Sequence, residues 1–281
     1  RPPQPPVYLF LIDVTVNSVN SGLLDIICNC IKKLLPMNND INNKKSFDSR
    51  TLISIITFDS TIHFYNLNPD LKQPQMLVVP DLADIFIPLP DDILVNAHEC
   101  QNNINMLLDN LPIIWKDNKI TDSCAGNAIK AAFMLLKKVG GKIMLFLSSI
   151  PNIGDMPVSL TRESKNTAKI KYKNIYTANQ PSNNVVDIKL KEMELLNPLN
   201  NLYSDLAQSL TQYQILVDLF ACPINQLDLA TIYPLIKNSG GTLYFYPQFN
   251  IHQYSEKIKE EIFFALTTEA AWESVMRIRI S

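Results

Sequence analysis

The residues best suited to chemistry lie where an apolar run ends. Residues 7–12 are all aliphatic or aromatic, and the carboxylate of Asp13 and the hydroxyl of Thr15 follow directly. Such a continuous run is typical of a strand buried on both faces inside a parallel sheet. Carboxylate and hydroxyl oxygens are the ligands that hard divalent cations prefer. The junction therefore predicts an oxygen-rich site at the carboxyl end of a buried strand.

The spacing of these oxygens resembles the start of the metal site of von Willebrand A-type domains. Those domains place Asp-x-Ser-x-Ser here and take a Thr and an Asp from two later loops. In this chain Asn17 replaces the last hydroxyl. The first later loop offers Thr121 and Ser123, but the second has Ser149 where a metal-binding domain has its acid.

We expect this degenerate site, formed by Asp13, Thr15 and Ser149, to hold no metal. Mg²⁺ needs near-octahedral oxygen ligation with carboxylate charge nearby, and a single Asp supplies too little of it. Asp13 would then cap a helix or accept hydrogen bonds from neighbouring hydroxyls. The alternative function is a metal-dependent adhesion-type domain that binds proteins through an ion.

Catalytic motifs are missing from the sequence. It contains no Gly-x-Ser-x-Gly elbow, no Gly-x-Gly-x-x-Gly fingerprint and no Walker loop. His63, His98 and His252 have no obvious nucleophile or carboxylate companion in the sequence, so we expect them at surface or turn positions. The chain is predicted not to be an enzyme.

Composition narrows the function classes further. The net charge is −2, from 25 Lys and Arg against 27 Asp and Glu, which argues against non-specific nucleic-acid binding. No apolar run reaches the roughly 20 residues that span a bilayer. The five cysteines are dispersed, as expected for reduced thiols in a cytosolic protein. The Pro-rich start lacks a Met, so we interpret the chain as a fragment of a longer protein.

Helical and extended patterns alternate along the chain. This alternation predicts an α/β fold with a doubly wound, mostly parallel sheet. A hairpin over residues 51–65 indicates an antiparallel edge. The strands are expected at residues 7–12, 51–58, 61–65, 75–79, 142–147, 215–220 and 242–246, and the helices at residues 22–35, 99–111, 125–139, 202–213, 227–239 and 251–267. Residues 81–96 are expected to be extended.

Domain boundaries follow from where these patterns stop. We predict one domain over residues 1–269, with a flexible insertion near residues 153–190, and the start of a truncated β-sandwich segment over residues 270–281. A strand leaving the domain over residues 270–280 would place Arg277 and Arg279 on one side. Two adjacent guanidinium groups suit carboxylates or phosphates.

Five stretches carry a resemblance to a known family. They are RPPQPPVYLFLID at residues 1–13, TFDSTIHFYN at 57–66, QPQMLVV at 73–79, LPDDILVN at 89–96 and VMRIR at 275–279. In their residues and in their order along the chain, these stretches resemble the trunk domain of the cargo-adaptor subunit of the COPII vesicle coat. The sister subunit of the same coat, which shares the trunk fold, is a further alternative.

The resemblance implies a von Willebrand A-like trunk without a working metal site. Family members pair with the GTPase-activating coat subunit through their trunks. They lie in the cytoplasm, peripherally on the endoplasmic reticulum membrane and on COPII vesicles, and they recognise sorting signals of cargo and SNARE proteins. One family pocket for acidic signals maps to Arg277 and Arg279. The family's zinc lies in an upstream domain, so no cofactor is expected in this fragment.

Overall fold

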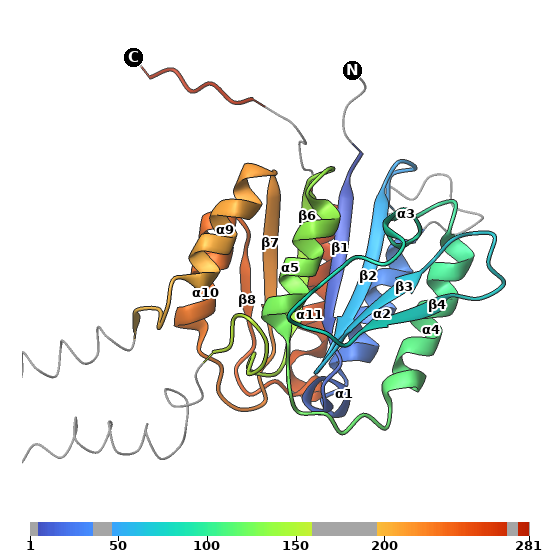
Figure 1. Cartoon of the computed structure of the whole chain (residues 1–281), viewed down its shortest axis with the longest axis horizontal. Helices are drawn as coiled ribbons and strands as arrows, with labels where there is room; N and C mark the ends of the chain where they lie inside the picture. The colour runs from blue at the N-terminus through green and yellow to red at the C-terminus, as the bar shows by residue number, and fades with distance from the viewer. Residues whose placement is uncertain (1–4, 36–46, 159–195, 269–274, 281) are drawn as a thin grey trace, which may run out of the picture.

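Among the residues that the structure describes, eight strands form one sheet (Figure 1). The computed structural model describes residues 5–35, 47–158, 196–268 and 275–280. The strands follow the order β4-β3-β2-β1-β6-β7-β8, and β5 pairs with β2 outside this path. Their bounds are β1 Val7–Asp13, β2 Leu52–Phe58, β3 Ile62–Asn66, β4 Gln75–Val79, β5 Val95–Asn96, β6 Gly141–Leu147, β7 Ile215–Ala221 and β8 Leu243–Phe245.

The centre of the sheet is parallel and one of its edges is antiparallel. β1 pairs in parallel with β2 and β6, and β7 and β8 continue the parallel order. β2, β3 and β4 form an antiparallel meander, which makes β4 the outermost strand of that edge. The arrangement confirms the predicted von Willebrand A-like, doubly wound sheet with an antiparallel edge.

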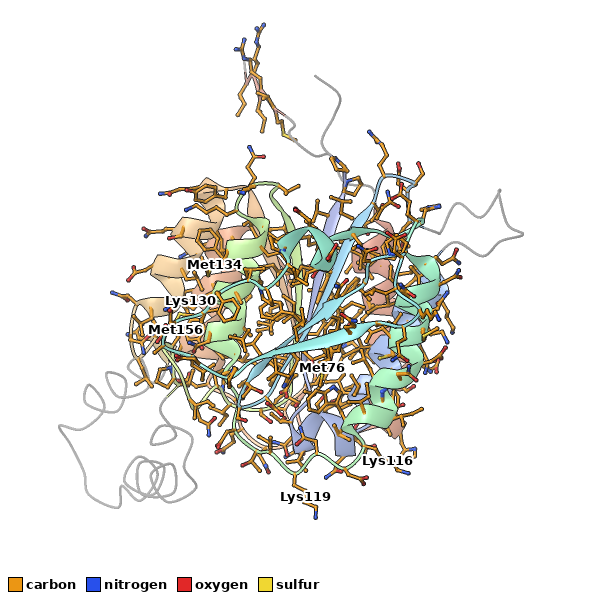
Figure 2. All side chains as sticks on the ribbon, turned by 45° about the vertical axis from the view of Figure 1, so that its right-hand side comes forward. Met76, Lys116, Lys119, Lys130, Met134 and Met156 are labelled. Atoms are coloured by element: carbon orange, nitrogen blue, oxygen red, sulfur yellow. The ribbon has the colours of Figure 1, made fainter. Side chains whose placement is uncertain are left out.

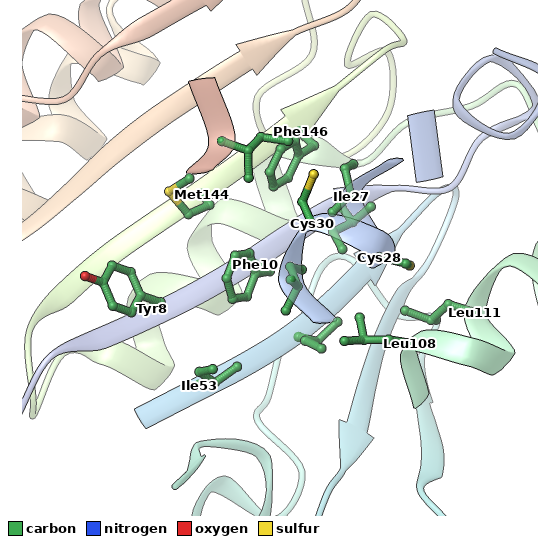
Figure 3. Close-up of a cluster of buried hydrophobic side chains, with 14 of the residues drawn as sticks. Tyr8, Phe10, Ile27, Cys28, Cys30, Ile53, Leu108, Leu111, Met144 and Phe146 are labelled. Carbon is green, nitrogen blue, oxygen red and sulfur yellow. The ribbon is translucent and has the colours of Figure 1, made fainter. Parts of the chain in front are cut away.

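Helices cover both faces of the sheet because β1 is apolar on both of its faces. Tyr8, Phe10 and Ile12 face the core under α2, α4 and α11, as Figure 3 shows in part. The alternate residues of β1 face the core under α5, α9 and α10. Each fully buried Leu, Ile or Phe contributes about 1.5–3 kcal/mol. The helices span α2 Leu23–Leu34, α4 Gln101–Trp115, α5 Ala125–Leu136, α9 Leu202–Gln212, α10 Leu229–Ser239 and α11 Ile251–Thr267.

Two Gly-Gly pairs connect helices to strands. Gly140 and Gly240 have φ values of 74° and 81°, the left-handed conformation that ends a helix at low cost in glycine. Gly241 is required for a second reason, because a Cβ there would lie 1.9 Å from the carbonyl oxygen of Val217. The close approach brings β8 directly alongside β7.

The cysteines contribute to packing. All five are free and buried. Cys28 and Cys30 both belong to α2 and take part in the core between this helix and the sheet (Figure 3). Burial raises the pKa of the Cys28 thiol to about 12 and that of Cys30 to about 11. Both thiols are therefore protonated at neutral pH, and neither is poised to react or to ligate a metal.

Several short elements differ from the sequence prediction. Residues 81–96, expected to be extended throughout, contain the helix α3 Pro90–Ile93 and the strand β5. The helix α1 Val16–Asn20 was not expected, because five residues show too little periodicity to predict one.

The helix α4 runs one turn beyond its predicted end and contains Pro112. The missing proline N–H removes one helical hydrogen bond. The side chain of Trp115 compensates: its ring lies 4.5 Å from that of His63, and its Nε1 donates to the hydroxyl of Tyr65 at 3.3 Å. Tertiary packing thus stabilises the last turn where local propensity predicts an end.

The predicted strand at the carboxyl end of the chain is not formed in the described residues. Residues 275–280 have no regular secondary structure, and all six are exposed. A strand needs a neighbouring backbone to complete its hydrogen bonds, and none of the described strands lies beside this segment. Residues 270–274, and the part of the predicted insertion near residues 153–190 that follows residue 158, lie outside the described residues. The domain boundary at residue 269 stays a prediction.

Candidate functional site

The oxygen-rich site lies where the sheet connections diverge. Asp13 ends β1, whose neighbours are β2 on one side and β6 on the other. The helix α2 connects β1 to β2 over one face of the sheet, and α9 connects β6 to β7 over the opposite face. Such a switch point at the carboxyl ends of parallel strands is where doubly wound folds commonly bind ligands.

The carboxylate of Asp13 is occupied by the protein itself. Its Oδ1 accepts from the Thr15 amide at 2.8 Å. Its Oδ2 accepts from the amide of Ser148 at 2.9 Å, from the hydroxyl of Ser148 at 2.7 Å and from the Ser149 amide at 3.0 Å. Three of these four donors thus reach Oδ2 and one reaches Oδ1. Asp13 therefore joins β1 to the end of β6.

Burial and hydrogen bonding act in opposite directions on this acid. The Asp13 side chain is completely buried, and burial raises its pKa above the ordinary value. The hydrogen bonds from Ser148 and Thr15 stabilise the anion and lower the pKa, but burial dominates. The expected alternative role for Asp13, accepting hydrogen bonds from a neighbouring hydroxyl, is thus confirmed by Ser148.

The remaining polar groups of the site bind one another. The hydroxyls of Thr15 and Ser149 lie 2.7 Å apart, and Asn17 Nδ2 donates to the Ser149 oxygen at 2.9 Å. Asn17, which replaces a hydroxyl of the metal-binding pattern, therefore brings an N–H donor to the site. The N–H group that Asn17 turns toward Ser149 cannot ligate a cation, and Ser149 brings no charge, so this arrangement fits a divalent cation poorly.

The loop before α5 supplies only part of what the sequence suggested. Thr121 is exposed, whereas Ser123 is buried and its hydroxyl has no hydrogen-bond partner in the described residues. Cys124 is also near the site: burial raises its pKa to about 12, with smaller contributions from Asp59 and Asp13. Across the described ranges, no three His, Cys, Asp or Glu side chains form a metal-binding group. The metal-free state stays a prediction.

A second polar cluster, which sequence analysis missed, surrounds Asp59 at the end of β2. Asp59 Oδ1 accepts from the Thr61 amide at 2.9 Å, and Oδ2 accepts from Asn118 Nδ2 at 3.1 Å. The same Asn118 group donates to the carbonyl oxygen of Val14 at 2.7 Å. Asn118 thus connects the two carboxylate-bearing strand ends.

His63 belongs to this cluster, and the expectation that it lies at the surface is wrong. Its side chain is 4% exposed, its Nδ1 lies 3.1 Å from the hydroxyl of Thr57, and its Nε2 lies 2.8 Å from that of Thr61. Burial lowers the pKa of His63, although nearby Asp59 opposes the shift. The position between Ile62 and Phe64 was the available sign, because every residue of β3 is buried. A hydroxyl as buried as that of Thr57 is closed to substrates, so the cluster is structural.

Arg277 and Arg279 lie apart from both clusters. They are exposed in the segment 275–280, and neither contacts an acidic side chain among the described residues. The last turn of α11 lies at the amino-terminal edge of the sheet, because the carbonyl oxygen of Ala265 accepts a hydrogen bond from Lys142, the second residue of β6. Asp13 lies at the carboxyl edge, so the structure does not join the arginines to it.

Comparison with known proteins identifies the family. Residues 3–265 match the family model described as the Sec23/Sec24 trunk domain. The chain belongs to this family. It is 38% identical over 279 residues to the protein transport protein SEC24 A of Arabidopsis thaliana, covering 99% of this chain and 24% of that protein. It is also 38% identical to human Sec24B over 282 residues, covering 99% of this chain and 20% of that protein.

A solved structure of the same family supports the fold. The crystal structure of the human COPII-coat protein Sec24c matches with a TM-score of 0.75 and 30% identity, over 94% of this chain and 32% of that one. These relatives are Sec24 proteins, which favours the cargo-adaptor subunit over its sister subunit and supports the prediction that the chain is not an enzyme. In the described part of the chain, no helix combines the length and apolarity needed to cross a membrane.

Proposed function

We propose that the chain is the trunk of a non-enzymatic COPII adaptor, which pairs with the GTPase-activating coat subunit and helps to recognise sorting signals of cargo and SNARE proteins. The family match over residues 3–265 carries the proposal. The chain spans about a quarter or less of the curated relatives given above, so the proposal concerns the full-length protein. We place that protein on the cytosolic face of the endoplasmic reticulum and on COPII vesicles, with its zinc in a separate domain.

The exposed edge of β4 supports pairing through the trunk. Of the described strands, β4 is the last of its side and hydrogen-bonds only with β3. Met76 and Val78 point to the same face of the sheet and are 43% and 47% exposed. Met76 is labelled in Figure 2. An open edge presents unpaired N–H and C=O groups that can bind a strand of a partner. We infer that the coat subunit binds here.

Prolines limit the length of this edge. Pro74 and Pro80 flank the uncharged strand Gln75–Val79 and cannot donate to a ladder. Trp115 packs on His63, which is paired with Val78, so the apolar face of the edge continues from β4 to the end of α4. The edge therefore fits one short strand of a partner together with apolar side chains.

The substitution Val78→Lys tests the pairing surface. A charge at the centre of an apolar interface should weaken binding to the purified GTPase-activating subunit at least tenfold, or by about 1.4 kcal/mol, in calorimetry or pull-down. Met134→Lys is the matched control, because Met134 is 46% exposed on α5, on the other face of the sheet (Figure 2). Equal binding by Val78→Lys and the unmodified protein would remove β4 from the interface.

The double substitution of Arg277 and Arg279 by Ala tests the signal site. Both guanidinium groups are exposed and free to bind carboxylates by charge-assisted contacts. In the full-length protein, the double variant should bind an acidic sorting peptide about tenfold or more weakly, and binding by the unmodified protein should weaken with salt. Substituting Lys116 and Lys119 by Ala removes the same charge elsewhere and serves as the control. Unchanged affinity in the arginine variant would remove the site assignment.

A further inference from the structure

Lys142 and Asp218 form an ion pair on the face of the sheet that α11 covers. Lys142 Nζ lies 2.5 Å from Asp218 Oδ2, and the two side chains are 16% and 3% exposed. They come from the neighbouring parallel strands β6 and β7. A buried ion pair is often no more stabilising than well-packed apolar residues of similar volume, so stability alone does not explain the pair.

Each member of the pair also binds a second element. Lys142 Nζ donates to the carbonyl oxygen of Ala265, in the last turn of α11, at 3.0 Å. Asp218 Oδ1 accepts from the amide of Thr242, the residue before β8, at 2.8 Å. A cation at the carboxyl end of a helix interacts favourably with its free carbonyls and its dipole. The pair therefore joins two strands, the start of a third and the end of α11.

The Lys142–Asp218 pair, called the clamp below, contacts the last described helix of the chain near its end. Ala265 lies two residues before the end of α11 at Thr267, and the next described segment carries Arg277 and Arg279. We infer that Lys142 and Asp218 are positioning residues, which hold the last turn of α11 and so fix the origin of the arginine segment. The inference deepens, and rests on, the proposed recognition of acidic signals.

Variants of the full-length protein test the clamp by hydrogen exchange. Lys142→Met should speed amide exchange in the last turn of α11, residues 265–268, about tenfold or more, because local opening becomes easier there. Acidic-peptide affinity should fall about threefold to fivefold, since a looser origin lowers the effective concentration of the arginines. Lys142→Arg keeps the charge and should restore both properties.

A double variant separates positioning from stability. Combining Lys142→Met with Asp218→Asn removes both charges, and the amide oxygen of the asparagine can still accept from Thr242. The thermal stability lost in Lys142→Met should largely return, because no unpaired charge stays buried. Exchange at residues 265–268 should stay fast and peptide affinity low, because Ala265 still lacks its ammonium donor. A merely structural role predicts that these properties recover together with stability.

Lys32→Met breaks an exposed ion pair between Lys32 and Asp109 and should leave exchange in α11 unchanged. Unchanged exchange in Lys142→Met would overturn the clamp, and fast exchange with full peptide affinity would overturn its positioning role. If replacing Arg277 and Arg279 by Ala leaves peptide affinity unaltered, the proposed signal site fails instead, and exchange still decides whether the clamp exists.

Discussion

The two groups of residues that look chemically active in the sequence, Asp13 and the arginines Arg277 and Arg279, differ in burial and in hydrogen bonding. Asp13 is completely buried, and its carboxylate accepts hydrogen bonds from four donors of the chain itself. Arg277 and Arg279 are exposed, and no acid among the described residues pairs with them. The charge at the carboxyl edge of the sheet thus takes part in internal hydrogen bonds, whereas the charges of the arginine segment are exposed.

The difference shows how a metal-type motif can become structural. A buried carboxylate needs compensation from a cation or from hydrogen bonds. Here the amides after the end of β6, together with Thr15 and the Ser148 hydroxyl, supply the hydrogen bonds. Asn17 donates to the hydroxyl oxygen of Ser149. These donors offset the buried charge, so we expect the acid to stabilise the fold without an ion.

The largest test of this contrast is Asp13→Ala. Its removal leaves the amides of Thr15, Ser148 and Ser149 buried without their acceptor, so the free energy of unfolding should fall by about 4 kcal/mol. Urea denaturation followed by circular dichroism measures the loss. Asp25→Ala, at an exposed acid of α2, should change it by less than about 0.5 kcal/mol. A loss below about 1 kcal/mol for Asp13→Ala would contradict the structural role.

A second prediction concerns the two residues at which the chain departs from the metal-binding pattern. The double substitution Asn17→Ser and Ser149→Asp removes the N–H donor and places a second carboxylate beside Asp13, so an ion is needed to offset the repulsion. In the absence of Mg²⁺, the variant should melt at a lower temperature than the unmodified chain. It should bind Mg²⁺ with a Kd on the order of 1 mM.

Calorimetry with the unmodified chain and with Asn17→Ser alone provides the controls. Neither should give a saturable Mg²⁺ signal. Saturable binding by the unmodified chain that is lost in Asp13→Ala would favour the metal-dependent adhesion-type domain instead.

A smaller effect distinguishes geometry from charge in the arginine segment. Replacing Arg277 and Arg279 by Lys keeps both charges but removes the planar fork that binds a carboxylate through two N–H groups. Acidic-peptide affinity should fall about fivefold, which is less than for the alanine variant, and its salt dependence should persist. Full affinity in the lysine variant would mean that the segment recognises charge alone.

The smallest effect concerns pH. Burial lowers the pKa of His63 below the 6.5 of the unfolded chain, so between the two values the unfolded state binds more protons. Stability should therefore fall as the pH drops below 6.5, and His63→Gln should make this slope shallower. The exposed residue His252 gives the control His252→Gln. Parallel slopes for the unmodified chain and His63→Gln would show that His63 is not shielded from protonation.

Much of the fold is predictable because its strands and helices carry strong patterns. The run that forms β1 is buried on both faces, as an apolar segment bounded by a polar residue indicates. The last turn of α4 is not predictable locally, because it depends on Trp115 packing against His63. Residues 275–280 alternate like a strand, but the described chain offers that segment no partner.

The candidate site was predictable in its location and only partly in its contacts. The placement of Asp13 near Ser149 follows from strand order, since adjacent parallel strands end at the same edge. Three of the four hydrogen bonds to Asp13 come from backbone amides, which any sequence possesses and which leave no trace in residue types. The same holds for Asn118, whose contacts with Val14 and Asp59 come from a loop without periodicity.

The two ends of the sheet have a consequence for stoichiometry. Of the described strands, β4 offers five residues at one end, whereas β8 at the other end has only three, Leu243–Phe245. A three-residue edge offers fewer ladder hydrogen bonds than a five-residue edge, so we expect strand addition at β4 rather than at β8. A molecule with a single usable end cannot link copies into a filament. If a partner strand adds to β4 as proposed, we expect strand-mediated assembly to stop at two subunits.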